Sequence, residues 1–290
     1  MKNGLVLEGG GMRGMFSAGV IDEMMEQNIR PDGIIGVSAG ATFGCNFKSN
    51  QKGRVLRYNT RFRHDPRYMG FCSLICTGNW VNVQFSYHTM PFRLDMFDTQ
   101  TFKDDPMEFY VVCTNIDTGE AVYKRLQELD ETNIDWIRAS ASLPIVSRPV
   151  VIDNLRLLDG GMSDSIPLKY FHSIGYTHNI VVLTQPKGFR KKAPSFLPLI
   201  RLTQKKNPQI VEILASRHIM YNQELDYISE HEQLGNTLLI YPEEELPIGR
   251  IDQNKKRMKL VYDMGREACK CKLSEIKELY RIDTNSQPLT

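Results

Sequence analysis

Short apolar runs alternate with longer segments of mixed polarity through the first part of the chain. Residues 4–7 and 33–37 are two such runs, and they predict strands buried on both faces of a sheet. The segments that follow, 12–27 and 39–47, are expected to be helices, and in the first of them apolar residues recur at helical spacing, at Phe16, Val20 and Met24. This order predicts parallel strand–helix units.

The rest of the chain predicts further elements of both kinds. Residues 108–124 predict two strands around a turn at Asp117-Thr118-Gly119, and residues 150–158 a hairpin that turns at Asp153-Asn154. Single strands are expected at residues 179–186 and 237–241, and helices at residues 132–142, 210–228 and about 253–280. Residues 60–105 predict an irregular excursion with short helices, and residues 187–198 a loop rich in Lys, Arg and Pro.

These elements together predict one α/β domain. No repeat, low-complexity tract or linker divides the sequence, and 290 residues fit a single large domain. In the last helix one face carries four apolar residues, Leu260, Val261, Met264 and Ala268. Such a face is more often packed on a core than on a partner, so we expect this helix to cover the sheet.

Composition narrows the classes of function. The formal net charge is only +2, which gives no electrostatic case for nucleic-acid binding. The six cysteines have no paired zinc spacing, no calcium loop motif is present, and no signal peptide is recognisable, so we expect a cytoplasmic protein with reduced thiols and no metal or cofactor. No apolar stretch reaches the roughly 18 residues that span a bilayer, so any membrane contact is expected to be peripheral.

The loop after the first predicted strand contains a G-x-G-x-x-G pattern, at Gly9, Gly11 and Gly14. Such loops hold either a dinucleotide pyrophosphate or another anion. A dinucleotide site needs an acidic residue at the end of the second strand to bind the ribose. Asp32 lies at the wrong end of that strand, and Ser38 occupies the end where the acid belongs. We therefore reject the dinucleotide interpretation.

Residues 36–40 form a G-x-S-x-G motif at the second strand–helix junction. Its small residues allow the tight turn that exposes a nucleophilic serine, here Ser38, at the edge of a sheet. The first loop then points backbone N–H groups at an oxyanion forming above Ser38, and Gly10 and Gly11 are the expected donors. Arg13 either braces that loop and adds positive charge or is a solvated residue of the first helical turn.

A serine nucleophile needs a base. None of the six histidines occupies a suitable loop: His178 precedes its strand, and His172 is predicted to lie on a helix surface. Asp159, at the end of a predicted strand and followed by Gly160-Gly161, is better placed, although an ordinary Asp-Gly turn is the commoner use of that dipeptide.

The sequences GGGMRG, GVSAG and DGG, in this order, resemble the patatin-like phospholipase family. The resemblance covers residues 4 to about 185, with residues 186–290 as a helical extension, and it implies a three-layer α/β/α core with a mainly parallel sheet. It further implies a lipid acyl hydrolase in which Ser38 is the nucleophile and Asp159 its base, with Gly10, Gly11 and Arg13 at the oxyanion hole. The motif glycines are Gly9, Gly14, Gly36, Gly40, Gly160 and Gly161. Many members of the family have Asn where this chain has Asp164.

The resemblance implies phospholipid or lysophospholipid esters as substrates. A general carboxylesterase or acyltransferase on the same dyad, or a non-catalytic module that binds a lipid, a nucleotide or another anion, are the alternatives. Two stretches, Phe62–Phe92 and Pro186–Leu202, mix apolar and basic residues in a way that suits a membrane surface, although the second equally fits a loop packed on the core.

Overall fold

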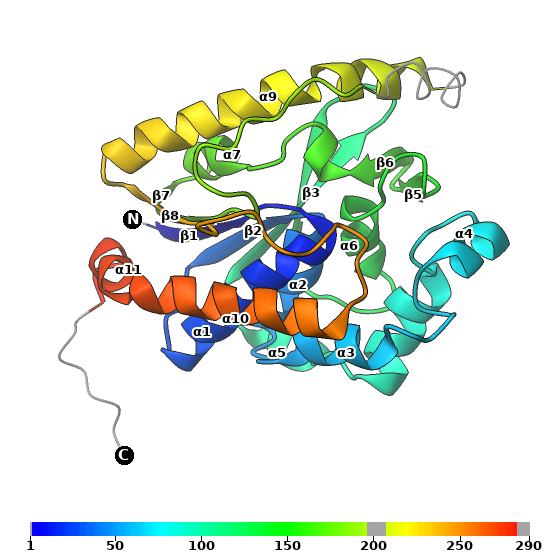
Figure 1. Ribbon diagram of the computed structural model, residues 1–290, viewed down its shortest axis with the longest axis horizontal. Helices are drawn as coiled ribbons and strands as arrows, with labels where there is room; N and C mark the ends of the chain where they lie inside the picture. The colour runs from blue at the N-terminus through cyan, green and yellow to red at the C-terminus, as the bar shows by residue number, and fades with distance from the viewer. Residues whose placement is uncertain (1, 196–206, 283–290) are drawn as a thin grey trace.

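A computed structural model describes residues 2–195 and 207–282. A sheet of eight strands separates two helical layers (Figure 1). Its main strand order is β5-β6-β3-β2-β1-β7-β8, with β4 paired to β3. The strands are β1 (Lys2–Leu7), β2 (Gly33–Val37), β3 (Glu108–Asn115), β4 (Ala121–Leu126), β5 (Val150–Ile152), β6 (Leu155–Asp159), β7 (Tyr176–Val182) and β8 (Thr237–Ile240). Strands β2, β1, β7 and β8 run parallel, and β3 joins them in parallel beside β2.

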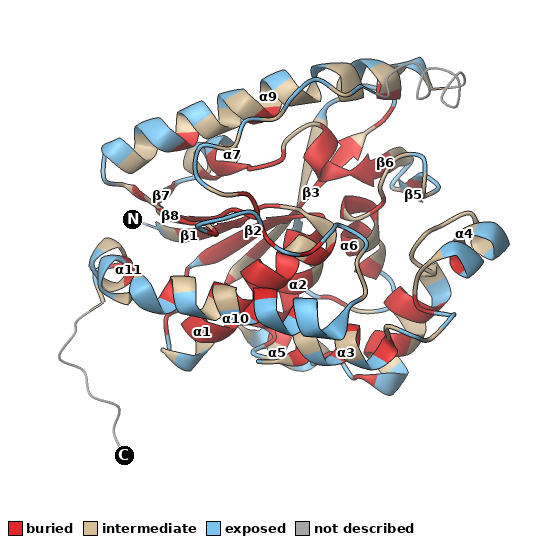
Figure 2. Cartoon of the chain, viewed as in Figure 1, coloured by how far each residue is buried: buried red, intermediate tan, exposed pale blue. Residues whose placement is uncertain are grey.

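The helices cover both faces of this sheet. On one face lie α1 (Met15–Glu26), α2 (Ala39–Lys48), α5 (Thr99–Asp104) and α10 (Lys255–Cys271), and on the other α7 (Leu168–Ser173) and α9 (Pro208–Gln233). A hydrophobic core lies between the sheet and each helical layer, and alternate residues of β1 pack into the two cores. Leu5 and Leu7 face the first core, and Val6 faces the second. The central strands are therefore buried on both faces, as Figure 2 shows in red. The predicted three-layer α/β/α core is confirmed.

Residues 54–104 form the excursion, which is more helical than irregular. It contains α3 (Arg54–Phe62), α4 (Phe71–Thr77), a π-helical segment (Gln84–Leu94) and α5. The buried carboxylate of Asp95 joins two parts of it, because it accepts from Arg57 at 2.8 Å and lies 3.1 Å from Arg54. The other predicted helix before the β5–β6 hairpin is α6 (Ile134–Ser140).

The C-terminal region is packed on the core, but it differs from the prediction in two respects. The single helix expected at 253–280 is broken into α10 and α11 (Leu273–Leu279). Val261 is buried as expected, whereas the side chain of Leu260 is 51% exposed. The prediction that Leu260 lies on the face that covers the core was therefore wrong. Helix α10 is fixed to α1 by polar contacts as well, since Tyr262 donates to Asp22 and Arg266 to Glu23.

Candidate active site

Ser38 lies on the tight turn between β2 and α2. Its φ of 55° and ψ of −119° belong to a region that residues with a side chain rarely adopt. The Ser38 N–H donates to Ser140 Oγ at 2.9 Å, and Ser140 Oγ donates to the Val112 carbonyl at 2.6 Å. The junction is thus the strand–turn–helix that the G-x-S-x-G motif predicts, and Ser140 holds it to the neighbouring strand.

Asp159 is brought to Ser38 by the register of the sheet. Val37 pairs with Val112 of β3, and Asp159 pairs with Cys113, the next residue along β3. Strand β4 occupies the other edge of β3 along residues 109–114. Strands β2 and β6 therefore lie end to end on the same edge of β3 and run toward each other, so that their carboxyl ends meet.

The carboxyl group of Asp159 is buried, and one of its two oxygens accepts a hydrogen bond among the described residues. Its Oδ1 accepts from the Gly161 N–H at 2.8 Å, and its Oδ2 has no hydrogen-bond partner among the described residues. Burial raises the pKa of Asp159, while the nearby Ser38 hydroxyl and the charge of Arg217 act against that rise. The Ser38 hydroxyl thus lies near the carboxyl group without completing a hydrogen bond to Oδ2. This oxygen is free to accept a proton.

Gly160 owes its identity to a close backbone contact. A Cβ on this residue would lie 2.1 Å from the carbonyl oxygen of Val112, the same oxygen that accepts from Ser140. The Asp-Gly pair is therefore more than an ordinary turn, because it presses the end of β6 against β3.

The glycine loop lies against Ser38. A Cβ on Gly9 would come 2.8 Å from the Ser38 Cβ, so only a bare backbone fits there. Within the described part of the chain no group accepts from the N–H of Gly10 or of Gly11, whereas the Met12 N–H donates to the Arg250 carbonyl at 2.9 Å. Two amides next to Ser38 are therefore free to donate. Gly36 and Gly40 lie at a close contact between α2 and the central strands, and Gly14 lies against α2. Gly161 lies beside the side chains of Asp159 and Arg217.

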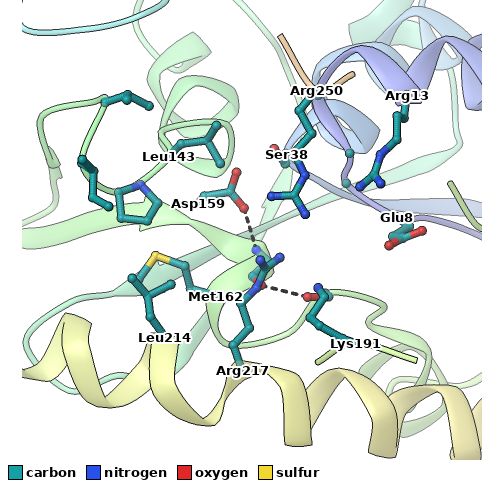
Figure 3. A pocket seen from close by; sticks show the side chains of 18 of the residues that line it. Glu8, Arg13, Ser38, Leu143, Asp159, Met162, Lys191, Leu214, Arg217 and Arg250 are labelled. Carbon is teal, nitrogen blue, oxygen red and sulfur yellow. Dashed lines mark hydrogen bonds between the residues drawn. The ribbon is translucent and has the colours of Figure 1, made fainter. Parts of the chain in front are cut away.

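Ser38, Asp159 and the loop line one cavity of about 220 Å³, together with three cations that lie after residue 186 (Figure 3). These cations are Lys191, Arg217 on α9 and Arg250 after β8. Arg13 lines the same cavity, and its Nε is buried. Of the two roles considered for Arg13, that of a solvated residue in the first helical turn is therefore not supported. No motif marks the three later cations, and only the basic loop drew attention to Lys191.

A second, mostly apolar cavity of about 130 Å³ opens on the other side of Ser38. It shares Gly11, Ser38, Leu143 and Arg250 with the first cavity. Aromatic and apolar residues of α2 and the excursion supply much of its wall: Phe43, Tyr58, Tyr68, Trp80, Tyr87 and Met90. Ser38 therefore stands between a charged space and an apolar one.

The histidines lie elsewhere. None of the six, all of which the structure describes, lines either cavity. Two placements correct the sequence analysis: His178 lies within β7 rather than before it, and His172 is half-buried, where its Nδ1 is 2.8 Å from the Tyr227 hydroxyl. Burial lowers the pKa of His172 to about 4.

Asp164 accepts from the Tyr123 hydroxyl at 2.7 Å. Glu224 on α9 lies beside it and accepts from the Ser165 N–H at 2.9 Å. Burial raises the pKa of both carboxyl groups, and the charge of Asp164 raises that of Glu224 further. The two acids therefore share a buried site next to the cavity and compete for ionisation.

Two general features of the described residues bear on ligands. No group of three or more His, Cys, Asp or Glu side chains among them is arranged to hold a metal ion. In the same residues, no helix has the length and apolar content needed to cross a membrane. The basic loop is described only to residue 195, so Phe196, Leu197, Leu199, Ile200 and Arg201 lie outside the described residues. Phe189, within that loop, packs on the Tyr221 ring.

Comparisons with known proteins identify several to which this chain is similar. Lysophospholipase NTE1 of Saccharomyces cerevisiae is 29% identical over 179 residues, which are 59% of this chain but only 10% of that protein. An uncharacterized protein, YjjU of Escherichia coli, is 28% identical over 295 residues, which cover 99% of this chain and 80% of that protein. The crystal structure of VipD from Legionella pneumophila aligns with a TM-score of 0.47 at 14% identity, over 96% of this chain and 67% of that one.

Two family models match the chain in separate regions. One describes a domain of unknown function and matches residues 207–281, which contain Arg217 and Arg250. The other describes the patatin-like phospholipases and matches residues 5–172, more than half of the chain, including all three glycine-containing motifs. The chain therefore belongs to the patatin-like phospholipase family.

Proposed function

We propose that this protein is a serine acyl hydrolase of lipid carboxylic esters that works through a Ser38–Asp159 dyad. The observation that carries the proposal is the meeting of β2 and β6 along β3, which sets the Ser38 hydroxyl near the buried carboxyl group of Asp159. One oxygen of that group has no hydrogen-bond partner in the part of the chain that the structure describes. Family membership and the lysophospholipase relatives support a lipid substrate.

In the first step Ser38 Oγ attacks the ester carbonyl carbon while its proton passes to Asp159 Oδ2. The oxyanion then accepts from the free N–H groups of Gly10 and Gly11, and a donor of this kind stabilises the transition state by about 2.7–4 kcal/mol. Collapse breaks the ester bond, and the leaving alcohol takes the proton from Asp159. Water next attacks the acyl-Ser38 ester and gives its proton to Asp159. Release of the fatty acid returns that proton to Ser38.

Burial supports this role for Asp159. An ordinary aspartate is too weak a base to deprotonate a serine, and a raised pKa makes the proton transfer less unfavourable. We assign Arg13 to support of the loop, because it lines the cavity at the first turn beyond Gly11. The apolar cavity beside Ser38 supports a fatty-acyl group as the acid part of the ester.

We further propose that the chain acts as one unit, with a core at residues 4–185 and the extension 186–290 packed on it. Support comes from the parallel pairing of β8 with β7 and from the Met12–Arg250 hydrogen bond, which joins the extension to the glycine loop.

Peripheral contact with a membrane is the remaining part of the proposal, and we place it at α4. This helix projects from the body of the protein (Figure 2), and its Phe71 and Ile75 are 72% and 83% exposed. The Phe71 ring packs edge-on against Trp80, which lines the apolar cavity. Exposed Ile145 lines the first cavity and exposed Ile251 the second, which adds apolar surface beside the site.

The test is labelling by a fluorophosphonate probe together with hydrolysis of lysophospholipid, diacyl phospholipid and short p-nitrophenyl esters. Ser38→Ala and Asp159→Asn should each lower hydrolysis by at least about a thousandfold, and Ser38→Ala should abolish labelling. Two matched controls, Ser216→Ala on the exposed side of α9 and Asp153→Asn in the exposed β5–β6 turn, should keep full activity.

The outcomes separate the alternatives. Labelling at Ser38 with hydrolysis of short esters alone would indicate a general carboxylesterase, and transfer of the acyl group to an added alcohol would indicate an acyltransferase. A protein that is folded but neither labelled nor active would be a binding module, and full activity in Asp159→Asn would remove Asp159 from the dyad.

A further inference from the structure

The cavity beside Ser38 carries more positive than negative side chains. Its wall holds four cations and two acids: Arg13, Lys191, Arg217, Arg250, Glu8 and Asp159. They come from distant parts of the chain, because Arg13 follows β1, Lys191 follows β7, Arg217 is on α9 and Arg250 follows β8. Figure 3 shows their side chains converging on one space.

The two acids offset only part of this positive charge, and Glu8 is held by neutral donors rather than by a cation. Both oxygens of Glu8 are already engaged, because one accepts from the Tyr221 hydroxyl at 2.7 Å and the other from the Thr184 N–H at 2.6 Å. Asp159 is buried against the Gly161 N–H, and burial favours its neutral form. The cavity therefore keeps a net positive potential.

Among the described residues these cations form no direct ion pair, although the charge of Glu8 acts on Arg13, Lys191 and Arg217. The buried Arg13 Nε has no hydrogen-bond partner among the described residues, and Arg217 Nε donates to a neutral carbonyl, that of Gly161. Within the described chain Arg250 forms no side-chain ion pair, and the Lys191 ammonium lies over the Tyr221 ring, 3.7 Å from its centroid. Arg13, Lys191 and Arg217 are half-buried, and gathering them at one wall is costly unless an anion joins them. Arg250 is exposed at the same wall.

The neighbouring cavity fixes the direction in which a substrate lies. An acyl chain fits the apolar wall formed by α2 and the excursion, so the alcohol part of the ester extends from Ser38 toward Arg217 and Lys191. Guanidinium groups bind phosphate oxygens through paired N–H donors, and an ammonium adds a point charge. A phosphate group on the alcohol part matches both the charge and the donors of this cavity.

We propose that Lys191, Arg217 and Arg250 of the C-terminal region, together with Arg13, form a phosphate-binding subsite for the alcohol part of the substrate. The position of the ester carbonyl at Ser38 rests on the proposed function; the binding of phosphate in the cavity does not. Three of these four residues lie outside the matched patatin-like region, residues 5–172. The subsite assigns a role to a region matched only by a domain of unknown function.

The experiment measures binding by the full-length Ser38→Ala protein, in which turnover cannot interfere. Three probes are compared: monomeric 1-oleoyl-lysophosphatidylglycerol, neutral 1-oleoylglycerol and glycerol 3-phosphate. Each is titrated against Ser38→Ala alone and against the same protein with Lys191→Gln, Arg250→Gln or Lys192→Gln added. Lys192 is the matched control, because it adjoins Lys191 but is exposed and does not line the cavity.

We expect Lys191→Gln and Arg250→Gln each to weaken binding of the lysophosphatidylglycerol by about tenfold or more, since a lost charge-assisted contact has that effect. Binding of 1-oleoylglycerol should change much less, and Lys192→Gln should bind both lipids like its parent. Glycerol 3-phosphate binding with the same dependence on Lys191 and Arg250 would extend the subsite to free phosphate esters, and its absence would restrict it to lipid head groups.

Equal affinities of all four proteins for the lysophosphatidylglycerol would overturn the subsite, provided that circular dichroism shows them folded. Failure of the proposed function is recognised separately, because an unlabelled, inactive Ser38 protein could still bind the phosphate lipid through these cations. Conversely, an active Ser38 enzyme with no preference for phosphate would retain the dyad and lose only the subsite.

Discussion

Ser38 and Asp159 stand at the carboxyl ends of two strands that approach each other along one edge of β3. This arrangement is available because β3 has eight residues and β2 only five, which leaves the end of β3 free for β6. An antiparallel strand paired along the whole length of β2 would instead place its carboxyl end, and with it Asp159, beside the amino end of β2. The unequal lengths of β2 and β3 therefore determine the geometry of the site.

Asp159→Asn should make the folded protein more stable at neutral pH while it removes activity. Because burial raises the pKa of Asp159 in the folded state, its ionisation opposes folding as the pH rises above the unfolded value. The gain should be greatest near pH 7 and should vanish at pH 3, where the carboxyl group is protonated in both states. Thermal unfolding of the wild-type protein and the variant at both pH values measures this gain in stability. A variant less stable than wild type at pH 7 would contradict the view that burial disfavours the ionised form of Asp159.

Gly160→Ala should damage both stability and activity. The new Cβ would lie 2.1 Å from the Val112 carbonyl oxygen, so β6 must move away from β3 and carry Asp159 with it. Overpacking of this kind destabilises by about 1–3 kcal/mol. Denaturant unfolding and ester hydrolysis measure the two effects. Gly249→Ala is the control, because a Cβ there meets only Asp252, at 4.0 Å. Equal stability and equal activity of the two variants would show that the contact between residue 160 and Val112 does not position Asp159.

The reactive residues could be recognised in the sequence because their backbone conformation and close contacts allow only a few residue types. A serine at φ 55° needs small neighbours on both sides, and a loop pressed against it needs glycine, so GVSAG and GGGMRG are readable without coordinates. Hydrophobic runs likewise predicted the central strands, since these are buried on both faces. The meeting of Asp159 with Ser38 could be inferred only from the family resemblance, because it depends on register.

The charged half of the cavity could not be predicted. Lys191, Arg217 and Arg250 come from a loop, a long helix and a second loop, and each has ordinary neighbours in the sequence. Only the packing of α9 and β8 on the core brings them together. The error at Leu260 has a related cause, because helical periodicity alone does not say which edge of an apolar stripe faces α1.

Asp164→Asn should stabilise the protein at pH 8 and have little effect at pH 4. Burial raises the pKa of Asp164 and of Glu224, so the folded pair is most stable when protonated and loses stability as the pH rises through those raised values. An amide keeps an acceptor for Tyr123 and removes one of the two charges. Melting temperatures at the two pH values test this, with Asp153→Asn as the surface control. A lower melting temperature of Asp164→Asn at pH 8 would contradict the view that Asp164 and Glu224 disfavour each other's ionisation.

Contact with a membrane through α4 predicts a defect that depends on the form of the substrate. The double change Phe71→Ser and Ile75→Ser should reduce hydrolysis of phospholipid in anionic vesicles by about tenfold, because two large exposed apolar side chains are lost. Hydrolysis of a monomeric short ester should be affected far less. Leu234→Ser, at an exposed position beyond the end of α9, is the control; equal loss on both substrates would place the defect in the site instead.

Binding of a phosphate lipid should weaken as the pH rises from 6.5 to 8.5. Burial, and next the charge of Arg217, lower the pKa of Lys191 to about 7, so the free protein loses this cation within that range. The charged groups that face Lys191 are Glu8 after β1, Arg217 and Glu224 on α9, and Arg250 after β8. A bound anion favours the protonated ammonium, so binding at pH 7.5 should take up a proton.

Lysophosphatidylglycerol suits this measurement because its phosphodiester keeps one negative charge over the whole range. Calorimetric titration in buffers of different ionisation enthalpy measures the proton uptake directly. Lys191→Gln should lose the uptake and most of the pH dependence, whereas Lys192→Gln should keep both, since Lys192 does not line the cavity. All of these proteins carry Ser38→Ala, so that the lipid is not hydrolysed during the titration. If Ser38→Ala with and without Lys191→Gln had the same pH dependence, the titrating group would be another residue and Lys191 would not contact the phosphate.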